Sequence, residues 1–166
     1  MTGFNFARVT LIGLFFSISA FANTSADECY QHETDPRTGW IYQNRAQWEA
    51  DRKDLWKVTP RMPSILRLKR GYDVAMVESV KSRGIGSDKR QHCYVGCRIA
   101  AEVGADIAEY AAYYKEHKDI SDCDPHTHFD LADISATLKG AEAGAMHSVK
   151  ADAAFCRLEC RKIFKK

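Results

Sequence analysis

The chain has 166 residues, of which 45% are apolar and 28% charged, with only 10 glycines and 4 prolines. This composition excludes a disordered, collagen-like or low-complexity chain and indicates a globular protein of about one domain. The formal charge is +2, because 24 lysines and arginines nearly balance 22 aspartates and glutamates. We therefore expect no nucleic-acid partner.

The first 22 residues have the pattern of a secretory signal peptide. One arginine precedes an apolar run over residues 9–21, and Ala20-Phe21-Ala22 places small residues where a signal peptidase requires them. A retained membrane anchor is the alternative, but the run is shorter than the about 20 apolar residues that span a bilayer. We predict cleavage after Ala22, a periplasmic or secreted protein, and no transmembrane segment in the mature chain.

The rest of the sequence predicts an irregular arm followed by one helical domain. Residues 23–39 are polar and contain the turn-forming run Asp35-Pro36-Arg37-Thr38-Gly39. Residues 40–166 show helical periodicity and no alternating strand pattern, so the predicted fold class is all-α. We divide this domain into a basic, tryptophan-rich half over residues 40–83 and a disulfide-stapled half over residues 88–166.

Six cysteines in an exported chain predict disulfide bonds. Four of them form two copies of Cys-x3-Cys, and this spacing places both thiols of a copy on one face of a helix. Two such helices in antiparallel order pair the first cysteine of one with the last of the other. Zinc held by four thiolates is the alternative, which an oxidising compartment disfavours. The predicted bridges are Cys93–Cys160, Cys97–Cys156 and, from the remaining two cysteines, Cys29–Cys123.

The first half of the predicted domain contains all three tryptophans and a basic stretch. The periodicity predicts helices over residues 40–57 and 72–83, separated by Pro60 and Pro63. Tryptophans on an amphipathic helix are usually buried in a core, and we expect this here; a binding face is the alternative. If this half binds a partner, the candidate binding residues are Trp40, Trp48, Arg52, Trp56, Arg67 and Arg70.

The second half begins with a long helical stretch predicted over residues 89–118, opened by a capping-box pattern of Asp88 and Gln91. One face of this stretch is made of small residues, and we expect it to pack against a last helix with a matching stripe over residues 145–163. A break at Gly104 would instead turn the stretch into a hairpin. The small residues are Cys93, Cys97, Ala100, Gly104, Ala108 and Ala111.

A further helix is predicted from residue 127 or 129 to residue 147, with Gly140 and Gly144 as its weak points. The neighbouring arc of the long stretch carries larger side chains suited to packing against the first half of the domain. These are Ile99, Val103, Ile107, Tyr110 and Tyr114.

Residues that could carry chemistry concentrate in the second half, which holds five of the six histidines. In a continuous helix His92 and His117 would lie about 37 Å apart, too far for one site. A break at Gly104 would let them converge, with a carboxylate orienting one imidazole as a general base. The candidate catalytic residues are His92, Glu116, His117 and Asp130.

A second candidate is a local metal site formed by His126, His128 and Asp130. Two histidines in a polar loop before a helix are more often a solvated helix cap. We therefore predict no metal and no cofactor.

The run Asp88-x-Arg90-x-His92-Cys93, the later Glu116-His117 and Phe129-Asp130-Leu131 with two following glycines resemble the helical domain at the ends of Rhs-type polymorphic toxins and other exported bacterial proteins. The resemblance covers residues 88–144 and implies an exported, bacterial, helical protein. This chain departs from the family's Arg-His pair, His-Glu pair and Asn pair, and each departure falls on a polar position.

Two functional classes follow. The first is an exported protein-interaction module that binds another envelope or secreted protein through the basic first half. The second is a small secreted enzyme or toxin-like effector, a hydrolase using the four candidate catalytic residues. The first is favoured, because no nucleophile, base and orienting group stand at diagnostic spacing.

Overall fold

A computed structural model describes residues 45–121, 127, 129–147, 149 and 151–165. The predicted signal peptide, the irregular arm, Trp40 and the Cys29–Cys123 bridge lie outside these residues. The described part of the chain contains helices and no strand, which confirms the all-α prediction. None of its helices is long and apolar enough to cross a membrane.

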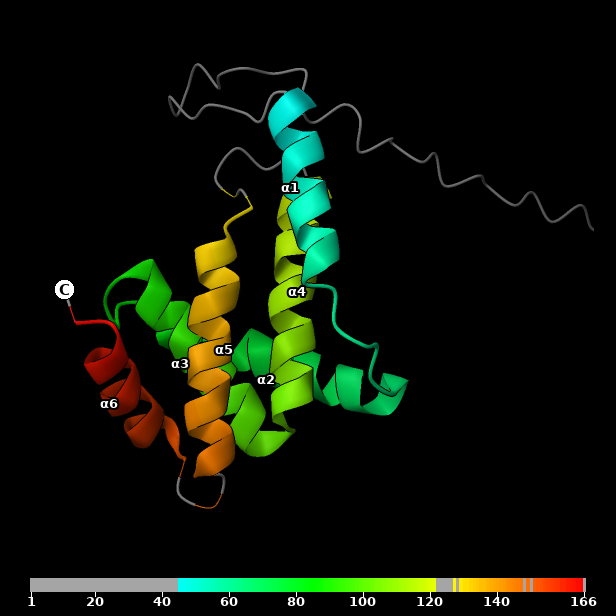
Figure 1. Ribbon diagram of the computed structural model, residues 1–166. Helices are drawn as coiled ribbons and strands as arrows, with labels where there is room; N and C mark the ends of the chain where they lie inside the picture. The colour runs from blue at the N-terminus through cyan, green and yellow to red at the C-terminus, as the bar shows by residue number, and fades with distance from the viewer. Residues whose placement is uncertain (1–44, 122–126, 128, 148, 150, 166) are drawn as a thin grey trace, which may run out of the picture.

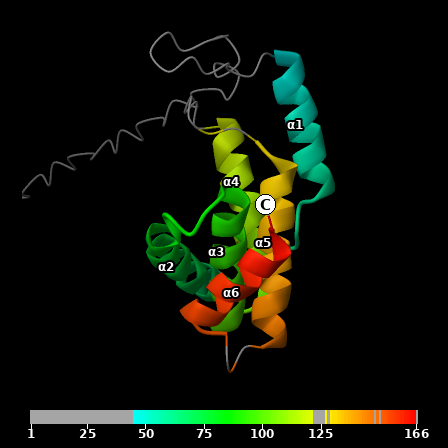
Figure 2. The ribbon, with the colours of Figure 1, turned by 90° about the vertical axis from the view of Figure 1, so that its left-hand side faces the viewer.

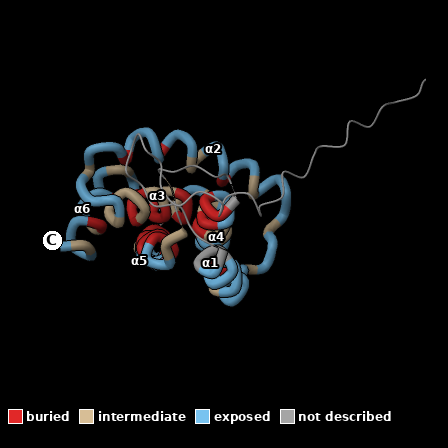
Figure 3. The backbone as a smooth tube through the Cα atoms, turned by 90° about the horizontal axis from the view of Figure 1, so that it is seen from above, coloured by how far each residue is buried: buried red, intermediate tan, exposed pale blue. Residues whose placement is uncertain are grey.

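Helix α3 lies at the centre of the fold and packs against α2, α4, α5 and α6. Figure 1 shows α4 and α5 side by side with α1 continuing above α4, and Figure 2 shows α6 lying across α3 and α5. Seen from above, burial concentrates in α3, α5 and α4, whereas α2 is largely exposed (Figure 3). The helices are α1 (Arg45–Lys57), α2 (Ile65–Ser82), α3 (Asp88–Glu102), α4 (Ala105–Ser121), α5 (Leu131–Met146) and α6 (Ala153–Ile163).

The continuous helix predicted over residues 89–118 is wrong, and the hairpin alternative is correct. The chain turns at Gly104, whose φ of 136° lies in a region that side chains rarely adopt. Arg67 of α2 stabilises this turn, because its guanidinium donates to the carbonyl of Val103 at 3.1 Å and pairs with Asp106 at 2.6 Å. The turn lets α4 fold back beside α3 and α5.

The closest approach between helices joins α3 to α5, not α3 to the last helix as predicted. A Cβ built on Gly140 would lie 1.9 Å from the carbonyl oxygen of Cys93, and one on Gly144 would lie 2.2 Å from that of Cys97. Gly96 makes the reciprocal contact, with the carbonyl oxygen of Thr137 at 2.2 Å. The glycines expected to be weak points of α5 are therefore the positions at which the two backbones meet.

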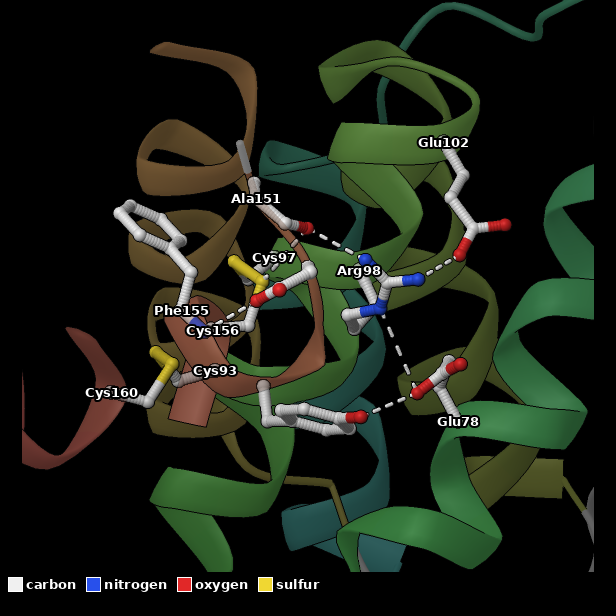
Figure 4. Close-up of a disulfide and its surroundings, with 11 residues drawn as sticks. Glu78, Cys93, Cys97, Arg98, Glu102, Ala151, Phe155, Cys156 and Cys160 are labelled. Atoms are coloured by element: carbon white, nitrogen blue, oxygen red, sulfur yellow. Dashed lines mark hydrogen bonds and ion pairs between the residues drawn. A yellow bond between two sulfur atoms is a disulfide. The ribbon is translucent and has the colours of Figure 1, made fainter. Parts of the chain in front are cut away.

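Two disulfides join α6 to the centre of the fold, and both confirm the predicted pairing. Cys93–Cys160 and Cys97–Cys156 each have a Cα–Cα distance of 5.8 Å, within the usual range for this bond. All four sulfurs belong to buried residues. The two bridges lie one helical turn apart along α3, so they fix both the position and the direction of α6 (Figure 4).

Helix α2 begins seven residues before the predicted start at residue 72. The chain enters it directly after Pro63, with Ser64 in an extended conformation as the N-cap. Likewise α3 has Ser87 as its N-cap, so Asp88 is the first helical residue rather than the cap of a capping box.

Trp56 does not lie in the core, because 72% of its surface is exposed, whereas its neighbour Leu55 is buried. The side chain of Trp48 is outside the described residues. The last helix starts at Ala153, and Val149 of its predicted apolar stripe is exposed.

Candidate functional site

The packing of α5 on α3 brings charged side chains from these two helices together near the start of each. We call this group the Lys89 cluster. It contains Asp88, Lys89 and His92 of α3, the N-cap Asp130 and Asp133 of α5.

Lys89 is the central cation of the cluster. Its ammonium lies 2.5 Å from a carboxylate oxygen of Asp130, 2.5 Å from one of Asp133 and 3.4 Å from one of Asp88. Burial lowers the pKa of Lys89, but the hydrogen bonds to Asp130 and Asp133 outweigh burial and the net effect is to raise it. Lys89 is therefore a fixed positive charge and cannot serve as a base near neutral pH.

His92 lies on the other side of the same carboxylates. Its Nε2 is 3.6 Å from an oxygen of Asp88 and 3.6 Å from an oxygen of Asp133, while its Nδ1 is 3.5 Å from the hydroxyl of Thr137. Burial raises the pKa of Asp133, although Lys89 and His92 oppose this effect.

Glu116 of α4 lies beside the cluster and forms a hydrogen bond to the beginning of α5. Its side chain is only 1% exposed, and one oxygen accepts a hydrogen bond from the backbone N–H of Asp130 at 2.7 Å. Burial raises the pKa of Glu116 to about 8. A side chain this deeply buried cannot reach a substrate, and its partner is a helix terminus, so the geometry gives Glu116 a structural role.

The structure thus brings three of the four predicted catalytic residues into one region and separates the fourth. His117 is exposed, and its ring lies 6.2 Å from that of Tyr113 on the same helix. Of the alternative metal set, Asp130 caps α5 by accepting from the N–H of Ala132 at 2.8 Å, and His126 and His128 are outside the described residues.

Sequence reasoning missed Lys89, Asp88 and Asp133 as members of this site. A signal was present for Asp88 alone, because it and His92 stand four residues apart and so share a helical face. Asp133 had no such signal, since only the packing of α5 on α3 brings it to His92.

Helix α2 presents a second candidate site, an exposed apolar surface. Six large apolar side chains on this helix are each between 52 and 84% exposed. Positions 65, 72, 76 and 80 repeat at helical spacing, so they form one stripe, and positions 66 and 77 extend it sideways. We call this surface the α2 face; its residues are Ile65, Leu66, Tyr72, Met76, Val77 and Val80.

Basic side chains surround and interrupt the α2 face. Lys69 and Asp73 lie within it and pair with each other at 2.6 Å. Arg61 precedes it, Arg70 borders it and Arg83 follows it, and these three exposed arginines form no ion pair with any other described residue. Of the predicted binding residues, Arg67 is instead used to hold the Gly104 turn, and Arg52 and Trp56 lie on α1 with exposed side chains.

The opposite side of α2 is anchored firmly. The hydroxyl of Tyr94 in α3 donates to the buried carboxylate of Glu78 at 2.5 Å, and Lys81 pairs with the same carboxylate at 2.9 Å. Figure 4 shows Arg98 between Glu78 and Glu102, with a hydrogen bond of 2.6 Å to the carbonyl of Ala151 beside the disulfides. The α2 face is therefore carried by a helix whose orientation is fixed.

Comparison of the chain with models of known protein families, with curated proteins and with solved structures gave no match.

Proposed function

We propose that the protein is an exported helical interaction module that binds an amphipathic, acidic helix of another envelope or secreted protein through the α2 face. The observation that supports this proposal is the exposure of six large apolar side chains on one helix. Monomeric proteins rarely expose a contiguous apolar surface of this kind unless it serves an interaction.

The charges of the α2 face favour a protein partner with acidic groups. Arg61, Arg70 and Arg83 lie before, beside and after the face and form no ion pair with another residue that the structure describes, so a helix with aspartates or glutamates beside its apolar stripe would complement them. A second copy of this chain would bring the same three cations and would be repelled. The α2 face therefore does not favour self-association of this chain.

The ion pair within the face favours a protein over a lipid surface. Lys69 and Asp73 lie between the apolar positions, with both side chains more than half exposed. An interfacial helix would have to place this pair about 5–10 Å into the headgroup and acyl boundary, where it would lose much of its hydration. A partner protein can supply polar groups at that point.

Export is part of the proposal, because the signal-peptide pattern of residues 1–22 and the disulfides are both compatible with an oxidising compartment. The bridges make the scaffold rigid, which lowers the entropy that binding has to offset.

The test uses a photo-crosslinking amino acid in place of Met76, introduced into the full chain in its native cell. Met146 is the matched control, because it is also an exposed methionine and lies at the end of α5, which does not contact α2. We expect one protein to be crosslinked from position 76 and not from position 146. The crosslinked segment should carry aspartate or glutamate beside an apolar stripe.

Purified partner and module then test the chemistry. Met76→Lys should weaken binding about tenfold or more. Arg70→Glu should also weaken binding, and changing an acidic residue of the crosslinked segment to lysine should restore it. Crosslinks only to lipid or to a second copy, equal crosslinks from both positions, or no effect of Met76→Lys with its melting temperature intact would each contradict the proposal.

A further inference from the structure

The Lys89 cluster contains three metal-ligating atoms that converge on one point. These are Nε2 of His92, one oxygen of Asp88 and one oxygen of Asp133, all within 4.8 Å of one another. The imidazole nitrogen is 3.6 Å from each of the two oxygens. Ligand atoms around a tetrahedral zinc ion, with bonds of 2.0–2.1 Å, lie about 3.4 Å apart. The two imidazole–carboxylate distances are therefore close to those of such a site, and the two carboxylate oxygens lie within 4.8 Å of each other.

The surroundings of His92 orient its imidazole for this role. The hydroxyl of Thr137 donates to the carbonyl of Asp133 at 2.9 Å, so its oxygen can accept a hydrogen bond from Nδ1–H of His92, 3.5 Å away, in the tautomer that carries the proton there. With the proton on Nδ1, the lone pair of Nε2 faces the two carboxylates. In this tautomer the imidazole can act as a metal ligand beside the two carboxylates.

The net charge of the cluster is negative enough to be balanced by a divalent cation. Asp88, Asp130 and Asp133 supply three negative charges, and Lys89 supplies one positive charge. Lys89 binds one oxygen of Asp133, and the other oxygen of that carboxylate faces His92. The ammonium and a metal ion can therefore share Asp133 without competing for the same atom, and a neutral His92 leaves two negative charges to be balanced.

We propose that Asp88, His92 and Asp133 bind one divalent transition-metal ion of the zinc class. Asp88 is 65% exposed, so the ion has a path from solvent and the fourth coordination position faces water. This site lies at the start of α3 and α5 and is separate from the α2 face, so it stands or falls independently of the proposed interaction.

The experiment titrates Zn²⁺ and Co²⁺ into the purified, fully oxidised protein, with calorimetry for stoichiometry and the visible absorption of bound Co²⁺ for geometry. We expect one ion per chain and Co²⁺ bands of tetrahedral intensity. His92→Gln should weaken binding at least about tenfold. Asp88→Asn should do the same, and it is the safer variant for folding because its side chain is largely exposed.

Two controls locate the ion. His147→Gln removes an exposed histidine at the far end of α5, and His126→Gln with His128→Gln removes the two histidines that precede α5 in the sequence; both variants should bind as tightly as the parent. The proposal is overturned if no one-to-one binding is seen, if His92→Gln and Asp88→Asn bind normally with unchanged melting temperatures, or if only the variant lacking His126 and His128 loses the ion.

Discussion

The α3–α5–α6 region and helix α2 use apolar and small residues in opposite ways. In the first region, glycines of α3 and α5 place two backbones in direct contact, and two buried disulfides attach α6. In α2, one side is anchored through Glu78 and Tyr94, and the other side exposes the six apolar residues of the α2 face. The first region thus holds the covalent and closest backbone contacts, and the second leaves an apolar surface exposed.

The exposed apolar residues of α2 therefore do not indicate a protein of low stability. The disulfides and glycine contacts hold the core without needing the α2 face. Changes in the first region should therefore alter the free energy of unfolding, and changes in the α2 face should alter binding.

The largest effect should follow removal of both disulfides. The bridges join residues 67 and 59 positions apart, and the chain-entropy relation assigns about 4 kcal/mol to closing a loop of that size. With all four cysteines changed to alanine, the free energy of unfolding should fall by about 4 kcal/mol or more. Because the loops are nested, loss of one bridge should cost about 2 kcal/mol.

Denaturant unfolding of the oxidised parent and the two alanine variants measures these differences. Hydrogen exchange of α6 should speed up in the same variants. A four-cysteine variant within about 1 kcal/mol of the parent would mean that packing alone holds α6 and that the contrast drawn above is wrong.

The next effect compares a glycine from each region. Gly140→Ala would force a Cβ against the backbone carbonyl of Cys93, which cannot move away, so we expect a loss of about 2–3 kcal/mol. Gly71→Ala in α2 meets only the side-chain methyl of Ile107 at 2.2 Å. That methyl belongs to a buried, β-branched side chain, which yields less readily than a flexible chain end but more readily than a backbone carbonyl. With the better helix propensity of alanine offsetting part of the cost, we expect a smaller net loss of about 1 kcal/mol.

Both glycine variants are measured by the same denaturant unfolding. Equal losses from the two substitutions would show that α2 is packed as rigidly as α5. The difference in packing between α2 and the α3–α5–α6 region would then be contradicted.

The smallest of the three effects concerns pH and Glu116. Burial raises its pKa to about 8, above the value in the unfolded chain, so the folded state binds the proton more tightly. The stabilisation is complete below the unfolded pKa of about 4.3 and is lost as the pH rises towards 8. Glu116→Gln keeps an oxygen that can accept from the N–H of Asp130 but cannot ionise. Between pH 5 and pH 8, we therefore expect the free energy of unfolding of the variant to fall by about 2 kcal/mol less than that of the parent.

The measurement is the free energy of unfolding at several values of pH between 5 and 8 for the parent and the variant. A variant curve parallel to that of the parent would show that Glu116 is ionised in the folded state.

Much of the fold could be predicted because it depends on local spacing. The two Cys-x3-Cys copies determined which cysteines pair, and the positions of α1 and α5 followed from periodicity. The start of α2 was missed because its apolar residues surround the helix, so no contrast between faces marked residues 65–71. The turn at Gly104 was left as an alternative, since a glycine within a small-residue stripe is compatible with both a turn and close packing.

The candidate sites were less predictable for a physical reason. His92 and Asp130 were selected by residue type. Asp133 lies beside His92 only because α3 and α5 pack closely together. Trp56 was expected in the core on the usual behaviour of tryptophan, yet only Leu55 beside it turns inward. Whether an apolar side chain is buried depends on which helix face finds a partner, and a single helix does not contain that information.

The spacing of the cysteines also affects the order in which the protein can be oxidised. Cys93 and Cys97 are synthesised about sixty residues before the cysteines they pair with. During that interval the two neighbouring thiols could join each other. Once α3 forms, however, side chains four residues apart have Cβ atoms about 5–6 Å apart, whereas a disulfide needs about 3.5–4.5 Å. Early formation of α3 therefore protects the two thiols from a local error until α6 arrives.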